Sequence, residues 1–152
     1  MGHSQIFYKT LKGVNIMLTK KITYKDFNGN ELTEEFYFNL SKPELMEMQL
    51  SVDGGFDKFL NKVIEEKDNA KLLNLFKMFI LKSFGVKSED GKRFIKNDAY
   101  TEAFTQTNAY SELYMSLVTN TDEAIAFITG IVPEMPELDD KIAEIKAANA
   151  NK

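Results

Sequence analysis

The amino-acid sequence predicts an α+β domain that is mostly α-helical, with an N-terminal β-hairpin packed on a bundle of about five or six helices. Two observations predict this class. β-Branched and aromatic residues fill two short runs near the N-terminus, and apolar residues recur at helical spacing through most of the remaining chain. The chain has 152 residues, of which 43% are hydrophobic and 28% charged, so it can bury one core without disulfides or metals.

The sequence divides into three parts. We expect a flexible extension or leader over residues 1–16, a single compact domain over residues 17–136, and a polar tail over residues 137–152 that is a frayed helix or disordered. Residues 1–16 do not match the pattern that follows, and Met17 offers a second start site. A docked strand or a basic amphipathic segment is the alternative for the extension.

The first element should be a β-hairpin, because residues 22–27 and 30–38 are rich in strand-forming residues and flank Asn28-Gly29. A two-residue loop would place Ile22 and Tyr24 beside acidic residues of the second strand, whereas an odd loop places them beside its apolar residues. We therefore predict a three-residue loop, Phe27-Asn28-Gly29, with Gly29 left-handed. The apolar face, which should pack on the helices, then holds Ile22, Tyr24, Leu32, Phe36 and Phe38. The solvent-exposed face holds Lys21, Lys25, Thr33 and Glu35.

Two helical segments should follow the hairpin. Ser41-Lys42-Pro43-Glu44 is a capping box with Pro in the first turn, so a helix should begin at Ser41. Asp53-Gly54-Gly55 then interrupts the helical pattern. An amphipathic helix is indicated by apolar residues at i, i+3, i+4, i+7 and i+8, namely Phe56, Phe59, Leu60, Val63 and Ile64.

The most apolar helix should be central. Asp68 or Asn69 can cap it, nine of the thirteen residues from 72 to 84 are apolar, and Gly85 supplies a stop. We expect Phe76, Phe79 and Ile80 at the centre of the core. Their predicted neighbours are Phe59, Val63, Leu113 and Leu117.

The last third of the domain should hold a small hairpin and further helices. A second hairpin near residues 86–95 is indicated by Asp90-Gly91 at its turn. Asp98 can cap a helix over residues 99–107, and Thr121 can cap another that ends at Gly130. A helix between them is indicated by apolar pairs at Ala109, Tyr110, Leu113, Tyr114, Leu117 and Val118. The last helix should turn Ala124, Ile125, Phe127 and Ile128 inward, and Pro133 and Pro136 should end the domain.

Residue types exclude most enzymatic chemistry. The chain has no Cys, and its only His is His3 in the extension, so thiol, disulfide and histidine chemistry lack their residues. Carboxylates occur as adjacent pairs whose side chains point apart on a helix or strand, namely Glu34-Glu35, Glu65-Glu66 and Asp139-Asp140. We therefore expect no catalytic residue, no cofactor, no metal and no enzyme. Acid pairs assembled across the fold are the open alternative.

Charge is distributed unevenly along the chain. The first 25 residues carry a net charge of +5 and the remainder −9, which gives −4 in total. An acidic body repels phosphate backbones, and Arg93 is the only arginine. No apolar run reaches the length of a membrane span, and the opening residues lack the features of a signal peptide. We therefore expect no nucleic-acid partner, no membrane and a cytoplasmic location.

Five stretches carry structural signatures in a particular order and spacing. They are ITYKDFNGN at 22–30, EFYFNLSK at 35–42, ELMEM at 44–48, DGKRFIK at 90–96 and AFITG at 126–130. In this order and spacing the chain resembles the tail assembly chaperones of long-tailed (siphophage-like) bacteriophages and prophages of Gram-positive hosts. The resemblance covers about residues 18–136.

The resemblance implies a non-enzymatic assembly factor. Such chaperones bind the long, helical tape measure protein and keep it soluble in the host cytoplasm until tail tube protein polymerises around it. They are expected to be absent from the mature virion, and they often occur with a frameshifted longer form, which would diverge in the tail after Pro133. Tail tube protein, that longer form and a second copy of the chain are further partners the resemblance allows. The alternative function is a structural tail or virion component without a chaperone role.

A chaperone for a helical client needs exposed apolar residues. Our candidates are Leu45, Met46 and Met48 on the capped helix, and Ile131, Val132 and Met135 after the last helix. Flexible Met residues suit adaptable binding grooves, but they also fill gaps in cores. Packing within the same domain is therefore the alternative for each of the six residues.

Overall fold

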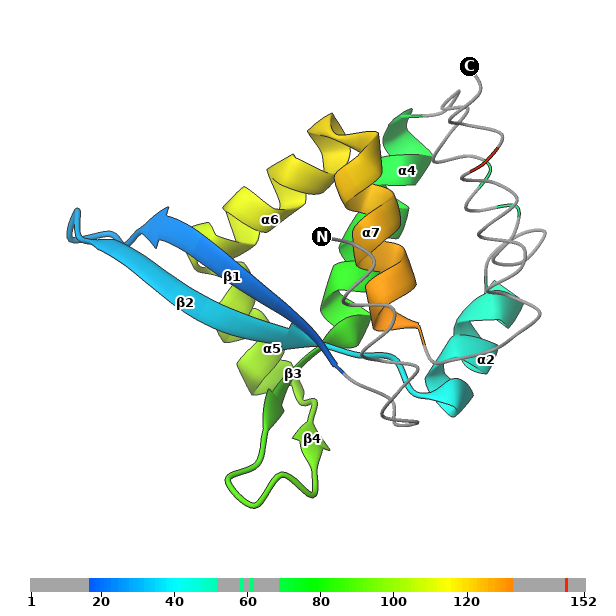
Figure 1. The fold of residues 1–152 in the computed structure, drawn as a ribbon, viewed down its shortest axis with the longest axis horizontal. Coiled ribbons are helices and arrows are strands. Elements are labelled where there is room, and N and C mark those ends of the chain that lie inside the picture. The colour runs from blue at the N-terminus through cyan, green and yellow to red at the C-terminus, as the bar shows by residue number, and fades with distance from the viewer. Residues whose placement is uncertain (1–16, 52–57, 59–60, 62–68, 133–146, 148–152) are drawn as a thin grey trace.

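The protein is an α+β domain that is mostly helical, as the sequence predicts, with a four-stranded antiparallel sheet in the order β1-β2-β3-β4 (Figure 1). This computed structural model describes residues 17–51, 58, 61, 69–132 and 147. The strands are β1 (Leu18–Lys25), β2 (Glu31–Phe38), β3 (Phe84–Lys87) and β4 (Phe94–Ile95). The helices are α2 (Lys42–Ser51), α4 (Asn69–Ser83), α5 (Asp98–Thr105), α6 (Asn108–Thr119) and α7 (Thr121–Ile131).

The β1–β2 hairpin has the predicted register and turn. Lys25 lies opposite Glu31, and the amide of Asp26 donates to the carbonyl of Asn30 at 2.9 Å, so the loop consists of residues 27–29. Gly29 has a φ of +86°, which is the left-handed conformation that glycine adopts without a Cβ clash. The Asp26 carboxylate accepts hydrogen bonds from the amides of Asn28 and Asn30, and these bonds stabilise the turn.

The predicted faces of the hairpin are confirmed, but the apolar face is less deeply covered than expected. Ile22 and Phe38 are buried, whereas Tyr24, Leu32 and Phe36 are half-buried. The loop of the hairpin extends beyond the helices (Figure 1), and the start of α6 reaches only as far as the end of β1, where Asn108 donates to the carbonyl of Lys25. The four residues predicted for the solvent-exposed face are all exposed, namely Lys21, Lys25, Thr33 and Glu35.

Tyr24 and Glu34 form a polar pair on the apolar face, near the loop of the hairpin. The Tyr24 hydroxyl donates a hydrogen bond to the Glu34 carboxylate across the two strands. This hydrogen bond raises the pKa of Tyr24 to about 12, because the nearby carboxylate disfavours the phenolate. The charge of Glu34 is therefore accommodated on a face that is otherwise apolar.

The capping box at the start of α2 is confirmed. The amide of Glu44 donates to Ser41 Oγ at 3.3 Å, and the amide of Ser41 donates to Glu44 Oε1 at 2.9 Å. The amphipathic helix expected over residues 56–64, the extension and the polar tail lie outside the described residues, apart from single positions.

The end of α4 differs from the prediction. The helix ends at Ser83, and Phe84 and Gly85 belong to β3, where they pair with Phe38 and Tyr37. Gly85 is therefore not a helix stop. A Cβ at Gly85 would lie 2.7 Å from the Phe94 ring, so glycine is required here for close packing between β3 and β4. The predicted second hairpin is confirmed, with Gly91 at a φ of +74° in its turn, although it begins at Phe84.

Two helices begin one residue earlier than predicted. Asn97 caps α5 and Asn120 caps α7, in place of Asp98 and Thr121, and their side chains accept hydrogen bonds from backbone amides three residues on. Both have extended backbone angles, which is the conformation that a capping residue needs. α5 also ends early, at Thr105, because Thr107 caps α6. α7 ends at Ile131, one residue after the predicted stop.

The predicted core is confirmed where the structure describes it. The side chains of Phe76, Phe79 and Ile80 are buried in one cluster. Leu113 and Leu117 are buried there too, while Phe59 and Val63 lie outside the described residues. The inward residues predicted for α7 are also buried, namely Ala124, Ile125, Phe127 and Ile128.

We predict that Phe79→Ala lowers the free energy of unfolding by about 3–5 kcal/mol, because it leaves a cavity in the core. Urea unfolding followed by circular dichroism measures this loss. Phe27→Ala is the matched control, because the Phe27 side chain is 80% exposed in the hairpin loop, and it should change stability by less than about 0.5 kcal/mol. A loss below about 1 kcal/mol for Phe79→Ala would contradict its central position.

Candidate partner-binding surface

The predicted partner-binding residues occupy two different environments. Leu45 and Met48 on α2, and Ile131 and Val132 at the end of α7, are all buried in the core cluster. Their burial corrects the expectation of an exposed apolar surface at these four positions, where packing within the domain is observed. Met46 is 61% exposed, and Met135 lies outside the described residues. Which of the six contacts a partner stays a prediction.

The backbone explains why these two groups of residues enter the same core. After β2, the amide of Asn39 donates to the carbonyl of Ser83 at the end of α4, and the amide of Leu40 donates to the carbonyl of Ile131 at the end of α7. Both bonds are 2.8 Å long. They satisfy carbonyls that a helix end leaves free, and they fix the start of α2 beside the ends of two other helices.

A part-buried lysine strengthens this junction from a distant part of the chain. Lys96 follows β4, and its Nζ lies 2.7 and 2.8 Å from the two carboxylate oxygens of Glu44. The same ammonium donates to the carbonyl of Asn39 at 2.7 Å, so all three of its donors are used. Glu44 also completes the capping box, and the ion pair therefore joins the second hairpin to the first turn of α2.

The pKa values at this junction reflect burial and pairing. Burial alone would raise the pKa of Glu44, but hydrogen bonds from Lys96 and the Ser41 backbone outweigh it and hold the pKa below its usual 4.5. Burial lowers the pKa of Lys96 more than Glu44 raises it, because the ammonium is the more enclosed of the two groups. Both side chains retain some exposure, so water screens part of their attraction.

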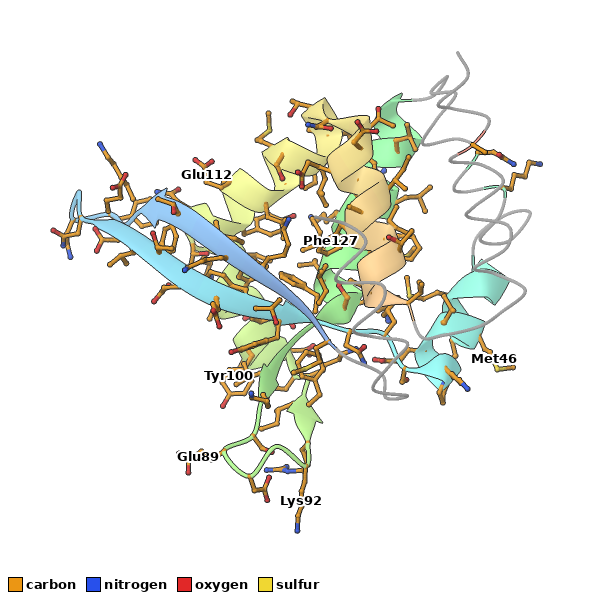
Figure 2. The ribbon with its side chains drawn as sticks, viewed as in Figure 1. Met46, Glu89, Lys92, Tyr100, Glu112 and Phe127 are labelled. Carbon is orange, nitrogen blue, oxygen red and sulfur yellow. The ribbon has the colours of Figure 1, made fainter. Side chains whose placement is uncertain are left out.

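The junction leaves the apolar side chain of Met46 on the exposed face of α2. Leu45 and Met48 face the core, whereas Met46, with Lys42 and Glu47, lies on the exposed face. Figure 2 shows the Met46 side chain pointing away from the body of the domain. The other exposed large apolar side chains in the described ranges are distributed over the loop of the first hairpin and three helices. They are Phe27, Leu73, Tyr100 and Met115.

An open cleft lies between β1 and α6. It has a volume of about 390 Å³, and Lys20 and Glu123, which form an ion pair at 3.4 Å, are among the residues that line it. Its walls are mostly polar. They are formed by Lys20, Lys21, Ile22 and Thr23 of β1, by Glu112, Leu113, Ser116 and Thr119 of α6, and by Asn120 and Glu123 at the start of α7.

The described residues contain no group of three or more His, Cys, Asp or Glu side chains that could hold a metal ion. Among the helices in the same ranges, none has the length and apolar character needed to cross a membrane. The capping box and the exposure of Met46 follow from the sequence, whereas the Lys96–Glu44 ion pair and the cleft do not. Neither produces a local sequence pattern. The two partners of the ion pair are 52 residues apart, and the cleft is lined by residues of β1 and α6, which are distant in sequence.

We predict that Lys96→Met lowers the free energy of unfolding by about 1–3 kcal/mol, because three charged hydrogen bonds are lost at the start of α2. The matched control is Lys92→Met, whose exposed side chain lies in the turn of the second hairpin, and its effect should stay within about 0.5 kcal/mol. Chemical denaturation at pH 7 measures both. Equal effects of the two substitutions would contradict the structural role of Lys96.

The contribution of the Lys96–Glu44 ion pair to the free energy of unfolding should also depend on pH. The pKa of Glu44 is lower in the folded protein than in the unfolded chain, so its stabilising effect is complete above the unfolded value near 4.5. The effect is lost as the pH falls through the folded pKa. The stability difference between the native protein and Lys96→Met should therefore shrink below pH 4.5, and a difference that stays constant down to pH 3 would contradict this assignment.

Comparison with known proteins places the chain in a family. Neither curated proteins nor solved structures show a match to this chain. A family model described as phage tail assembly chaperone matches residues 17–152, which include all the elements described above. The chain therefore belongs to the phage tail assembly chaperone family.

Proposed function

We propose that this protein binds the tape measure protein of a long-tailed phage or prophage of a Gram-positive host and keeps it soluble until the tail tube polymerises around it. The observation that carries this proposal is the family match over residues 17–152. The family is one of chaperones and not a known family of enzymes. The proposal assigns the protein to the host cytoplasm during assembly, and it includes tail tube protein and a frameshifted longer form of the chain as further partners.

The exposed face of α2 suits a helical client. Met46 presents a flexible thioether side chain to solvent, and such side chains adapt to varied apolar surfaces. The Lys96–Glu44 ion pair and the capping box hold this helix to the rest of the domain, so binding would not require α2 to be ordered first.

The small size of this contact suits reversible binding. One exposed methionine on a short helix gives each copy a modest affinity, while many copies along one long client accumulate affinity through multivalency. A growing tube could then displace the copies one at a time. Weak individual contacts therefore suit a transient chaperone, whose copies leave the assembled particle.

We predict that Met46→Asp reduces co-purification with coexpressed tape measure protein at least about tenfold, because a desolvated carboxylate opposes an apolar contact. Met115→Asp is the matched control, because Met115 is a methionine with a similar exposure, 54%, on α6. This control should retain the client. Circular dichroism should show native folding for both variants, since both side chains are exposed.

The two levels of this proposal fail differently. If Met46→Asp folds and still solubilises the client, the α2 surface is wrong while the chaperone role stands. If the native protein neither binds nor solubilises its tape measure protein, the proposed function itself is wrong.

We also predict that purified phage particles lack this protein, because a chaperone displaced during tube assembly does not remain bound. Quantitative mass spectrometry of gradient-purified particles measures its copy number relative to tail tube protein. A stoichiometric presence in particles would instead indicate the structural role that the sequence left as the alternative.

A further inference from the structure

Among the described residues, strand β1 has an open edge. It is the first strand in the order β1-β2-β3-β4, and no other described strand pairs with its second side. Asp26 and Asn30 form a hydrogen-bonded pair, and the register continues unchanged along both strands. Since hydrogen-bonded pairs recur at every second residue of an antiparallel ladder, the backbone groups of the even-numbered residues of β1 bond to β2. The backbone N–H and C=O groups of Thr19, Lys21 and Thr23 therefore point away from β2.

A contact from α6 confirms this direction and limits the open edge. Lys25 belongs to the same odd-numbered set, and its carbonyl accepts a hydrogen bond from Asn108 Nδ2 at 2.8 Å. No such side chain caps the outward groups of Thr19, Lys21 and Thr23 within the described ranges. Five residues of edge, 19–23, are thus available for strand pairing, with Asn108 at one end.

The open edge faces the cleft between β1 and α6. Its 390 Å³ of open volume lies directly beside Lys21 and Thr23, so an extended chain can approach their backbone groups. The opposite wall offers Glu112 and Ser116 of α6, and Figure 2 shows Glu112 on this helix. An incoming strand would turn one face toward this polar wall and the other toward solvent beside the exposed lysines.

Charge selects the kind of strand that fits. β1 contains Lys20, Lys21 and Lys25 and no acidic residue. Lys20 pairs with Glu123, but Lys21 and Lys25 form no ion pair within 4 Å in the described part of the chain. On its paired side, β2 places Glu35 and Glu31 directly opposite these two lysines. On the open side, the acids of the cleft are Glu123, which pairs with Lys20, and Glu112 on the opposite wall.

We propose that the open edge of β1 binds an extended acidic segment of a partner protein by strand addition. The segment pairs with the backbone of Thr19, Lys21 and Thr23, and its carboxylates lie beside Lys21 and Lys25. Its other face carries small or uncharged polar side chains because it meets Glu112. A second copy of β1 is the wrong occupant, since its own three lysines would repel this edge. This site lies on different elements from Met46 and does not depend on the proposed function.

Amide hydrogen exchange measured by NMR on the full chain tests the proposal. The probe is an acetylated and amidated nine-residue peptide of alternating threonine and glutamate, and the control peptide has lysine in place of each glutamate. The glutamate peptide should slow exchange at Lys21 and Thr23 at least about tenfold, whereas the lysine peptide should leave it unchanged. Equal protection by both peptides, no protection, or protection that rises with protein concentration alone would overturn the proposal.

Two sets of variants separate backbone pairing from charge. Thr23→Pro removes an outward amide without removing a bond to β2, so it should abolish protection at Lys21 while the fold is retained. Lys21→Glu combined with Lys25→Glu should reverse the preference toward the lysine peptide. The matched control, Lys77→Glu with Lys92→Glu, changes two exposed lysines elsewhere and should keep the original preference. If Thr23→Pro does not fold, the charge reversal decides, and an unchanged preference overturns the proposal.

Discussion

The burial of Phe38 is the interaction on which the rest of the structure depends. Its side chain is completely buried, and its ring centroid lies 5.8 Å from Phe84 of β3, 5.9 Å from Phe104 of α5 and 5.2 Å from Phe127 of α7. A two-stranded hairpin is only marginally stable alone in water. Packing of this one residue at the end of β2 therefore attaches the hairpin to elements that lie far apart in the sequence.

The position of Phe38 also determines where the chain goes next. Asn39 and Leu40 follow it directly, and their amides bond to the ends of α4 and α7. Lys96 binds the carbonyl of Asn39 and the carboxylate of Glu44 from the second hairpin. The orientation of α2, and with it the outward position of Met46, is thus a consequence of how β2 ends. The position of this short helix is therefore fixed by contacts with residues outside the helix.

Local signals predicted most elements, and distant contacts account for the differences. The capping box, the three-residue loop and the apolar face of α6 follow from residues close in sequence. Asn97 and Asp98 are both good capping residues, so sequence alone could not choose between them. Phe84 and Gly85 leave the helical pattern because they pair with β2, and apolar spacing could not show that Leu45 and Val132 are buried by distant elements. The cleft and the open edge depend on strand order, which leaves no local pattern.

The two proposed surfaces obey different physical rules, and this difference bears on how an assembly chaperone could hold and release its partners. The contact at Met46 is apolar, so salt should affect it little and a competing apolar surface, such as a polymerising tube, can replace it. The contact at the β1 edge combines backbone hydrogen bonds with exposed charges, and salt screens the charges over about 8–10 Å at physiological ionic strength. The two proposed sites lie on different elements, α2 and β1, so a partner at one does not occupy the other. Added salt should therefore weaken the proposed contact at the β1 edge and leave the proposed contact at Met46 largely unchanged.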